Sequence, residues 1–133
     1  MEATPIFIGI DVSKARLDVF VHPLGSRQCV GNEEAGIKTL VDGLRELKPA
    51  LIVLEATGGI ERALTRALAS AELPVVVVNP RQVRDFAKAT GQLAKTDTID
   101  AEVLARFGEA IRPAVRRLPD EATLALRALI ARR

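Results

Sequence analysis

Cysteine, histidine and large aromatic side chains are scarce in this sequence of 133 residues. It has one cysteine, Cys29, one histidine, His22, four phenylalanines and neither tryptophan nor tyrosine. A single cysteine excludes an internal disulfide and a cysteine-based metal site, and a single histidine excludes a site that needs a histidine pair. The scarcity of aromatic side chains argues against a protein that binds single-stranded nucleic acid by base stacking.

Long apolar runs are also missing from the chain. No run approaches the roughly 18 residues that a membrane span needs. The N-terminus lacks the basic stretch followed by an apolar one that marks a secretory signal. We therefore expect a cytoplasmic protein without membrane contact.

The amount of apolar and charged residue is typical of a globular protein, with 48% hydrophobic and 27% charged residues. The net charge of +2 is unevenly spread. Residues 1–80 hold 8 Lys and Arg against 10 Asp and Glu, whereas residues 81–133 hold 11 against 7. A basic second part is a weak indication of a polyanionic partner, although charge alone fits ordinary solvated helix faces better.

Apolar periodicity and turn residues divide the chain into strands and helices. The predicted strands are 6–11, 16–22, 27–31, 51–54 and 74–78. The predicted helices run from a cap at Asn32 to Pro49 and over 60–71, 82–89, 97–109 and 120–133, with a linker at 112–118. Three strands in a meander, followed by two strands that each come after a helix, predict an α/β fold that is ribonuclease H-like (RuvC-like). This is a five-stranded mixed sheet with flanking helices, in which the fourth strand lies parallel beside the first.

Two acidic residues, Asp11 and Glu55, each stand at the carboxyl end of an apolar strand. Sites in open α/β sheets form outside those ends, so neighbouring first and fourth strands would bring both carboxylates to one rim. Two anions so close repel each other unless a cation lies between them. Oxygen ligands without histidine or cysteine favour Mg²⁺ or Mn²⁺. For either residue alone, an ordinary turn residue or strand-end charge is the better interpretation than a metal ligand. The two together favour a metal site.

A second acidic pair, Asp97 and Asp100, begins the predicted 97–109 helix. Residues three apart share a helix face, and Asp100 borders an apolar stripe that would pack on the sheet. That stripe consists of Ile99, Val103 and Phe107. Carboxylates also cap helices, so this pair alone is weak evidence. Together with the strand-end pair, it makes possible a two-metal site, in which hard cations stabilise the charges of phosphodiester chemistry.

Basic residues follow the fifth predicted strand. Arg81, Arg84 and Lys88 share one helix face, and Lys95 precedes Asp97. Such a stripe suits contacts to nucleic-acid phosphates, which position a protein without reading base sequence. A solvated amphipathic face explains it about equally well.

Two short segments next to the strand-end carboxylates are predicted to be turns. Ser13 is expected to cap the turn after Asp11 rather than act as a nucleophile. The ATGG segment at 56–59 allows close approach of a phosphate, but a tight strand-to-helix turn explains it sufficiently.

Four motifs occur in order: GIDVSK at 9–14, LEATGG at 54–59, VNPRQ at 78–82, and KTD with IDA at 95–101. With these motifs, nearly the whole chain closely resembles the DEDD transposases of bacterial insertion sequences, recombinases guided by a bridge RNA. The resemblance implies a RuvC-like catalytic domain with Mg²⁺ as cofactor and Asp11, Glu55, Asp97 and Asp100 as metal-binding tetrad. It also implies DNA and a guide RNA as partners, and a homo-oligomer.

The resemblance also predicts the domain organisation. Residues 1–111 would form the catalytic domain, and 112–133 a linker and the start of a C-terminal connector helix, whose apolar side chains pair with a second copy. Family members carry a further C-terminal domain with a serine used in strand exchange. The sequence ends before such a domain, so we expect the metal-binding half of a recombinase.

Three alternatives stay open. A Holliday-junction resolvase-like nuclease would share the fold and the carboxylates and act alone on four-way junctions. A fragment of a sugar-kinase or actin-like ATPase would need a glycine-rich hairpin after Asp11, where this chain has VSKA. A non-catalytic nucleic-acid-binding remnant would keep its acidic residues only as scaffold.

Overall fold

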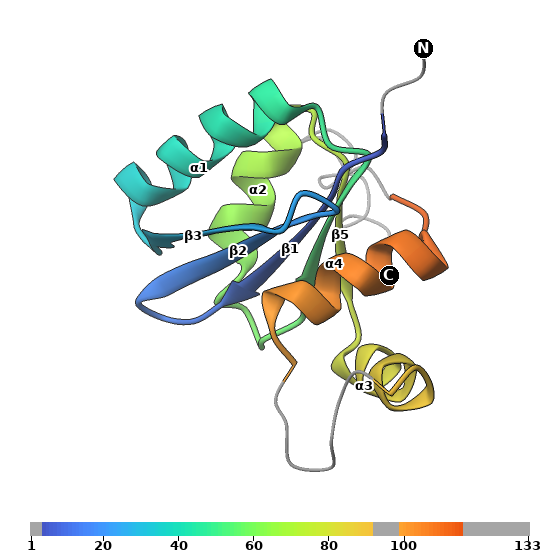
Figure 1. The fold of residues 1–133 in the computed structure, drawn as a ribbon. Coiled ribbons are helices and arrows are strands. Elements are labelled where there is room, and N and C mark those ends of the chain that lie inside the picture. Colours follow the sequence, from blue (N-terminus) through green and yellow to red (C-terminus); the bar gives the residue numbers. More distant parts are fainter. Residues whose placement is uncertain (1–3, 92–98, 116–133) are drawn as a thin grey trace, which may run out of the picture.

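A five-stranded mixed sheet lies between two pairs of helices in the computed structural model, which describes residues 4–91 and 99–115 (Figure 1). The strands are β1 (Phe7–Val12), β2 (Arg16–His22), β3 (Ser26–Gly31), β4 (Leu51–Glu55) and β5 (Val75–Val78). The helices are α1 (Glu34–Leu47), α2 (Arg62–Ser70), α3 (Pro80–Ala89) and α4 (Ala101–Ile111). Among the described residues, no helix combines the length and the apolar character that crossing a membrane requires.

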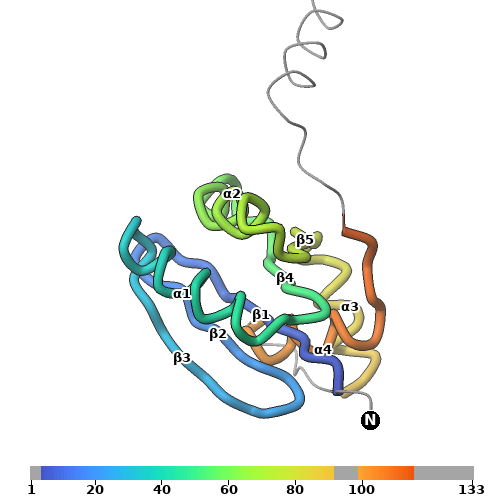
Figure 2. The backbone as a smooth tube through the Cα atoms, turned by 90° about the horizontal axis from the view of Figure 1, so that it is seen from above, coloured from blue at the N-terminus to red at the C-terminus, as the bar shows by residue number. Residues whose placement is uncertain are grey.

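The strand order is β3-β2-β1-β4-β5, which can be followed across the sheet in Figure 2. β1 pairs antiparallel with β2 and parallel with β4, and β4 pairs parallel with β5. The parallel neighbour relation of β1 and β4 confirms the predicted ribonuclease H-like arrangement. Ser13 closes the β1–β2 turn as expected, because its hydroxyl donates to the Arg16 carbonyl oxygen and accepts from the Arg16 N–H.

The two sides of the sheet carry separate apolar cores. Ile8 and Ile10 of β1 pack in the core that also contains the buried side chains of α1 and α2. Phe7 packs on the other side, with residues of α3 and α4. Because side chains alternate along a strand, Gly9 and Asp11 share the side of Phe7, which α4 covers.

Helix α4 lies directly against β1 at Gly9. A Cβ atom added to Gly9 would overlap the carbonyl oxygen of Ala101 and lie 2.6 Å from the backbone nitrogen of Ala105. Both alanines are buried and pack with Phe20 of β2. Small residues on the strand and on the helix therefore allow the two backbones to approach closely.

The start of α1 differs from the prediction. Glu33 is its N-cap, and a carboxylate oxygen of Glu33 accepts from the Gly36 N–H at 2.9 Å. Asn32, the predicted cap, instead donates to the Ser13 carbonyl oxygen at 2.7 Å. The Asn32 amide thus ties the end of β3 to the β1–β2 turn, a long-range contact that local sequence does not indicate.

The other boundaries are close to the predicted ones. α2 begins at 62 instead of 60, after two glycines with positive φ, and α3 begins at 80 instead of 82, with Asn79 as its cap. The predicted 112–118 linker is described as far as residue 115, and the predicted 120–133 helix lies outside the described residues.

Gly9→Ala is expected to lower the free energy of unfolding by about 1–3 kcal/mol, because the added methyl group must push α4 away from β1. Gly43→Ala in α1 is the matched control, since a Cβ atom there meets nothing within 4 Å. It should raise stability by about 0.5–1 kcal/mol, because alanine favours a helix over glycine. Urea unfolding followed by circular dichroism measures both changes. An unchanged stability of Gly9→Ala would contradict the close contact.

Candidate active site

Asp11 and Glu55 lie side by side at the carboxyl ends of two neighbouring parallel strands. The register of β1 and β4 pairs Ile10 with Leu54, so the two acidic residues are the next along each strand. Glu55 shares the side of Val53, which packs with α3 and α4. The sheet therefore brings both strand-end carboxylates to one rim and one side.

Strand β2 adds a carboxylate that the sequence analysis missed. Asp18 is the partner of Asp11 across the antiparallel β1–β2 pair. The available indication was the hairpin itself, because a turn centred on residues 13–15 sets this register.

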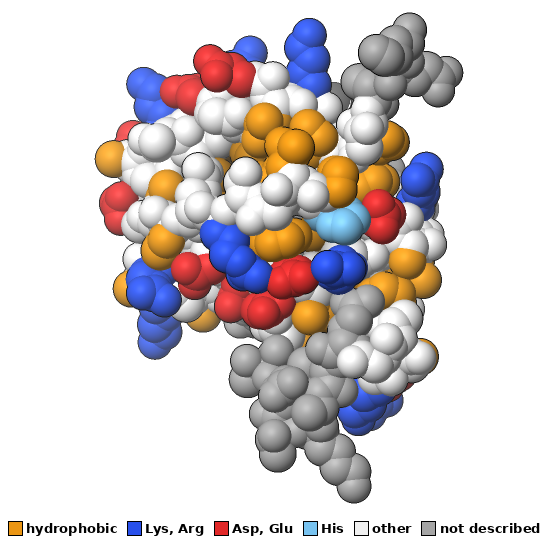
Figure 3. Space-filling model, in the orientation of Figure 1, with side chains coloured by type: hydrophobic (Ala, Val, Ile, Leu, Met, Phe, Trp, Pro, Cys, Tyr) orange, Lys and Arg blue, Asp and Glu red, His pale blue; other side chains and the backbone are white. Residues whose placement is uncertain are grey.

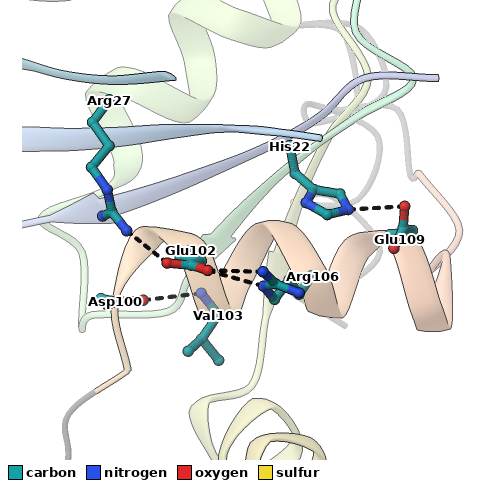
Figure 4. A network of polar contacts seen from close by, with 7 residues as sticks. All are labelled: His22, Arg27, Asp100, Glu102, Val103, Arg106 and Glu109. Carbon is teal, nitrogen blue, oxygen red and sulfur yellow. Dashed lines mark hydrogen bonds and ion pairs between the residues drawn. The ribbon is translucent and has the colours of Figure 1, made fainter. Parts of the chain in front are cut away.

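Asp100 stands at the beginning of α4 (Figure 4), and its charge is close enough to raise the pKa of Asp11. Its Oδ1 accepts from the Val103 N–H at 3.0 Å, and its backbone is extended, so Asp100 is the N-cap of α4. The predicted start of the 97–109 helix is therefore wrong, since α4 begins at Ala101 and both Ile99 and Asp100 lie outside it. An aspartate carboxylate competes for free helix N–H groups, which favours this position over one inside the helix. The three residues of the predicted apolar stripe are buried as expected, Val103 and Phe107 on α4 and Ile99 just before the helix.

Burial and neighbouring charges raise the pKa values of both strand-end carboxyl groups. Burial contributes most to the raised pKa of Asp11, followed by the charges of Asp18 and Asp100, while Arg16 opposes the shift. Burial also raises the pKa of Glu55, followed by the charge of Asp11, while Arg84 lowers it. Asp11 is thus the centre of a group of mutually repelling carboxylates.

An open groove of about 530 Å³ begins at Asp11 and crosses β2 to the edge strand β3. Its lining residues are Asp11, Arg16, Asp18, Val19, Arg27, Gln28, Cys29, Asp100 and Ala101. Acidic and basic side chains form one mixed band across the face that carries β2, β3 and α4 (Figure 3). The groove therefore combines carboxylates with guanidinium groups.

The carboxylates do not form a ready-made metal cage. Within residues 4–91 and 99–115, no three His, Cys, Asp or Glu side chains are grouped so that they could hold a metal ion. Asp97 and Lys95 lie outside the described residues. The donor chemistry nevertheless suits a hard cation, because Asp11, Glu55 and Asp100 offer oxygens only. A cation would also relieve the repulsion that raises the pKa of Asp11.

Glu61, which the sequence analysis did not single out, closes the loop after Glu55. Its carboxylate accepts from the Thr57 hydroxyl at 2.7 Å and from the N–H groups of Gly59 at 3.0 Å and Thr57 at 3.4 Å. Burial disfavours the charge of Glu61, but these hydrogen bonds outweigh burial, so its pKa is lowered. The loop donors thus serve an internal carboxylate, which supports a strand-to-helix turn over a phosphate cradle.

Helix α3 places one of its basic residues, Arg84, close to Glu55. Arg81 and Lys88 are exposed, whereas Val83 and Ala87 are buried against the core. Arg84 is half-buried and close enough to lower the pKa of Glu55. Of the three residues of the predicted basic face, Arg84 is thus the one that the structure places near a strand-end carboxylate.

Asp11→Asn is expected to stabilise the metal-free protein at neutral pH, because it removes a charge that the fold disfavours. Since the folded-state pKa of Asp11 is raised, the penalty is complete above that pKa and disappears as the pH falls to the unfolded value. Thermal unfolding in EDTA between about pH 7 and about pH 3, below the ordinary aspartate pKa, measures the difference. Asp42→Asn, on the exposed side of α1, should show no such gain. A neutral-pH melting temperature of Asp11→Asn below that of the parent would refute this account.

Known proteins resemble this chain in sequence and in fold. A family model described as a transposase, DEDD_Tnp_IS110, matches residues 8–133. The pilin gene-inverting proteins of Moraxella lacunata and Moraxella bovis are each 28% identical to it. The alignments cover 96% of this chain and 41% of each relative, so the chain spans less than half of their length.

The structure of T. thermophilus RuvC in complex with a Holliday junction substrate matches 85% of this chain and 99% of that chain. The TM-score is 0.57 at 15% sequence identity, a likeness of fold. This match confirms the RuvC-like α/β fold predicted from the order of elements. The family match over residues 8–133 confirms the resemblance drawn from the four motifs, and the chain belongs to the DEDD transposase family.

Proposed function

We propose that this chain is the catalytic domain of a DNA transposase or recombinase that carries out metal-dependent phosphodiester chemistry. The observation that carries the proposal is the convergence of Asp11, Glu55 and Asp100, from two strand ends and one helix start, on one side of the sheet. Family membership supports DNA as the substrate. The named relatives invert a gene, and the RuvC structure contains a Holliday junction.

Asp11, Glu55, Asp97 and Asp100 would hold the metal ions, with Mg²⁺ as the ion and Mn²⁺ as a substitute. When bound, such ions activate the attacking oxygen and stabilise the charge that develops on the phosphate and the leaving oxygen. Asp11 and Glu55 must be ionised to bind a cation, and their raised pKa values make protons strong competitors. Metal affinity therefore falls as the pH drops through those pKa values.

Residues 1–111 form the proposed catalytic domain, and residues 112–133 the linker and the beginning of a connector helix. The end of α4 at Ile111 supports this boundary, since Arg112 follows in the left-handed conformation that ends helices. The family resemblance supports a guide RNA and a second copy of the chain as partners.

Mg²⁺ or Mn²⁺ should raise the melting temperature of the parent protein. A ligand at about 100 times its Kd stabilises the folded state by about 2.7 kcal/mol. Asp11→Asn and Glu55→Gln should each abolish most of this rise, while Asp42→Asn, on α1, should keep it. Thermal unfolding across a metal titration is the measurement. The absence of any rise, even with duplex DNA present, would contradict the metal site and favour the non-catalytic remnant.

The basic face of α3 should contribute to DNA affinity through phosphate contacts. Arg81→Gln and Lys88→Gln are each expected to weaken binding and to reduce the slope of log K against log salt by about 0.9. Fluorescence anisotropy of labelled duplex DNA at several salt concentrations measures the slope. Arg66→Gln, exposed on α2, is the control and should leave the slope unchanged. Unchanged slopes for the α3 variants would remove these contacts.

A further inference from the structure

Three charged side chains join β3 to α4 beside the groove (Figure 4). Arg27 Nη2 donates to Glu102 Oε1 at 2.6 Å. Glu102 Oε2 accepts from Arg106 Nε at 3.1 Å and lies 3.0 Å from Arg106 Nη2. Two guanidinium groups therefore share one carboxylate, and the cluster has one positive charge in excess.

Arg27 is held in place and faces the same side of the sheet as the carboxylates. It is the β3 partner of Phe20, and its guanidinium stacks over the Phe20 ring at 4.7 Å from the centroid. Its side chain is still 58% exposed and lines the groove together with Asp11 and Asp100. A guanidinium has five N–H donors, so a group bonded to Glu102 through one nitrogen has others suited to a phosphate.

Arg16 stands on the same groove, nearer to Asp11. Its side chain is 66% exposed, and its ion pair with Asp18 is long, at 3.6 Å. Its charge is close enough to lower the pKa of Asp11 against the effect of burial. The groove thus offers two exposed guanidinium groups on the β2–β3 side of the acidic centre.

We propose that this groove binds the sugar-phosphate backbone of the DNA strand, with Arg27 and Arg16 contacting phosphates next to the reacting one. The inference rests on the proposed function, because it takes the reacting phosphate to lie at Asp11. Glu102 orients Arg27 and competes with DNA for its charge. The loop after Glu55 does not offer an equivalent contact, because Glu61 already takes the N–H groups of Thr57 and Gly59.

The test uses labelled duplex DNA in EDTA, where metal-dependent chemistry cannot proceed. Arg27→Gln should weaken binding and reduce the salt slope by about 0.9. Glu102→Gln should have the opposite effect, with tighter binding and a steeper slope, because the amide still accepts from Arg27 but no longer neutralises it. Arg45→Gln, exposed on α1 at the far side of the sheet, is the matched control and should change neither quantity.

The opposite signs separate DNA contact from a purely structural role. If Arg27 served only to join β3 to α4, both variants would weaken binding, and this result would overturn the proposal, as would an unchanged slope for Arg27→Gln. Arg27→Lys keeps the charge and serves if Arg27→Gln does not fold. It should retain the slope but bind less tightly, because an amine cannot form the two-pronged contact.

The metal response separates this inference from the proposed function. A parent protein without a Mg²⁺-dependent rise in melting temperature would defeat the proposed function. An Arg27→Gln variant that keeps this rise and binds DNA as the parent does would defeat only the phosphate contact.

Discussion

The close contact between α4 and β1 is the constraint on which the candidate site depends. Gly9 has no side chain where Ala101 and Ala105 cross it, so the helix begins almost on the strand. The helix start therefore stands beside the strand end, and Asp100 comes within electrostatic reach of Asp11. A larger residue at this crossing would push α4 away from β1 and so separate Asp100 from Asp11. The absence of a side chain at Gly9 thus sets how close Asp100 comes to Asp11, two residues further along the strand.

The cluster of Asp11, Asp18 and Asp100 destabilises the fold, and packing elsewhere in the molecule compensates for it. Asp11 has two like charges beside it, which Arg16 only partly offsets, and is partly removed from water, which is unfavourable for an ionised carboxylate. Two separate apolar cores, together with the contacts of α4 with His22 of β2 and Arg27 of β3, hold the elements together in spite of this repulsion. Such stored repulsion is typical of sites that bind cations, since the ion releases it on binding.

Local patterns in the sequence were sufficient for the sheet and for the strand-end residues, but not for contacts set by register or tertiary packing. Short apolar runs at 6–11 and 51–54 showed where these two strands end, so Asp11 and Glu55 could be recognised. Asp18 could be recognised as a neighbour of Asp11 only from the pairing register of the β1–β2 hairpin. Asp100 was predicted to lie in the first turn of the helix but is its N-cap, because aspartate is compatible with both positions. Glu61 was missed because its partners, the Thr57 hydroxyl and the N–H groups of Thr57 and Gly59, surround it only once the loop has folded.

The Asp100 carboxylate caps α4 and also lies close to Asp11, so its position depends on the first turn of the helix. One oxygen completes the first turn of α4, so the other cannot be positioned unless that turn is intact. Helix ends fray more readily than helix centres, and each fraying event would carry this carboxylate away from its neighbours. The stability of this first turn therefore sets how long Asp100 stays beside Asp11, and the Arg27–Glu102 ion pair opposes fraying because it joins the start of α4 to β3.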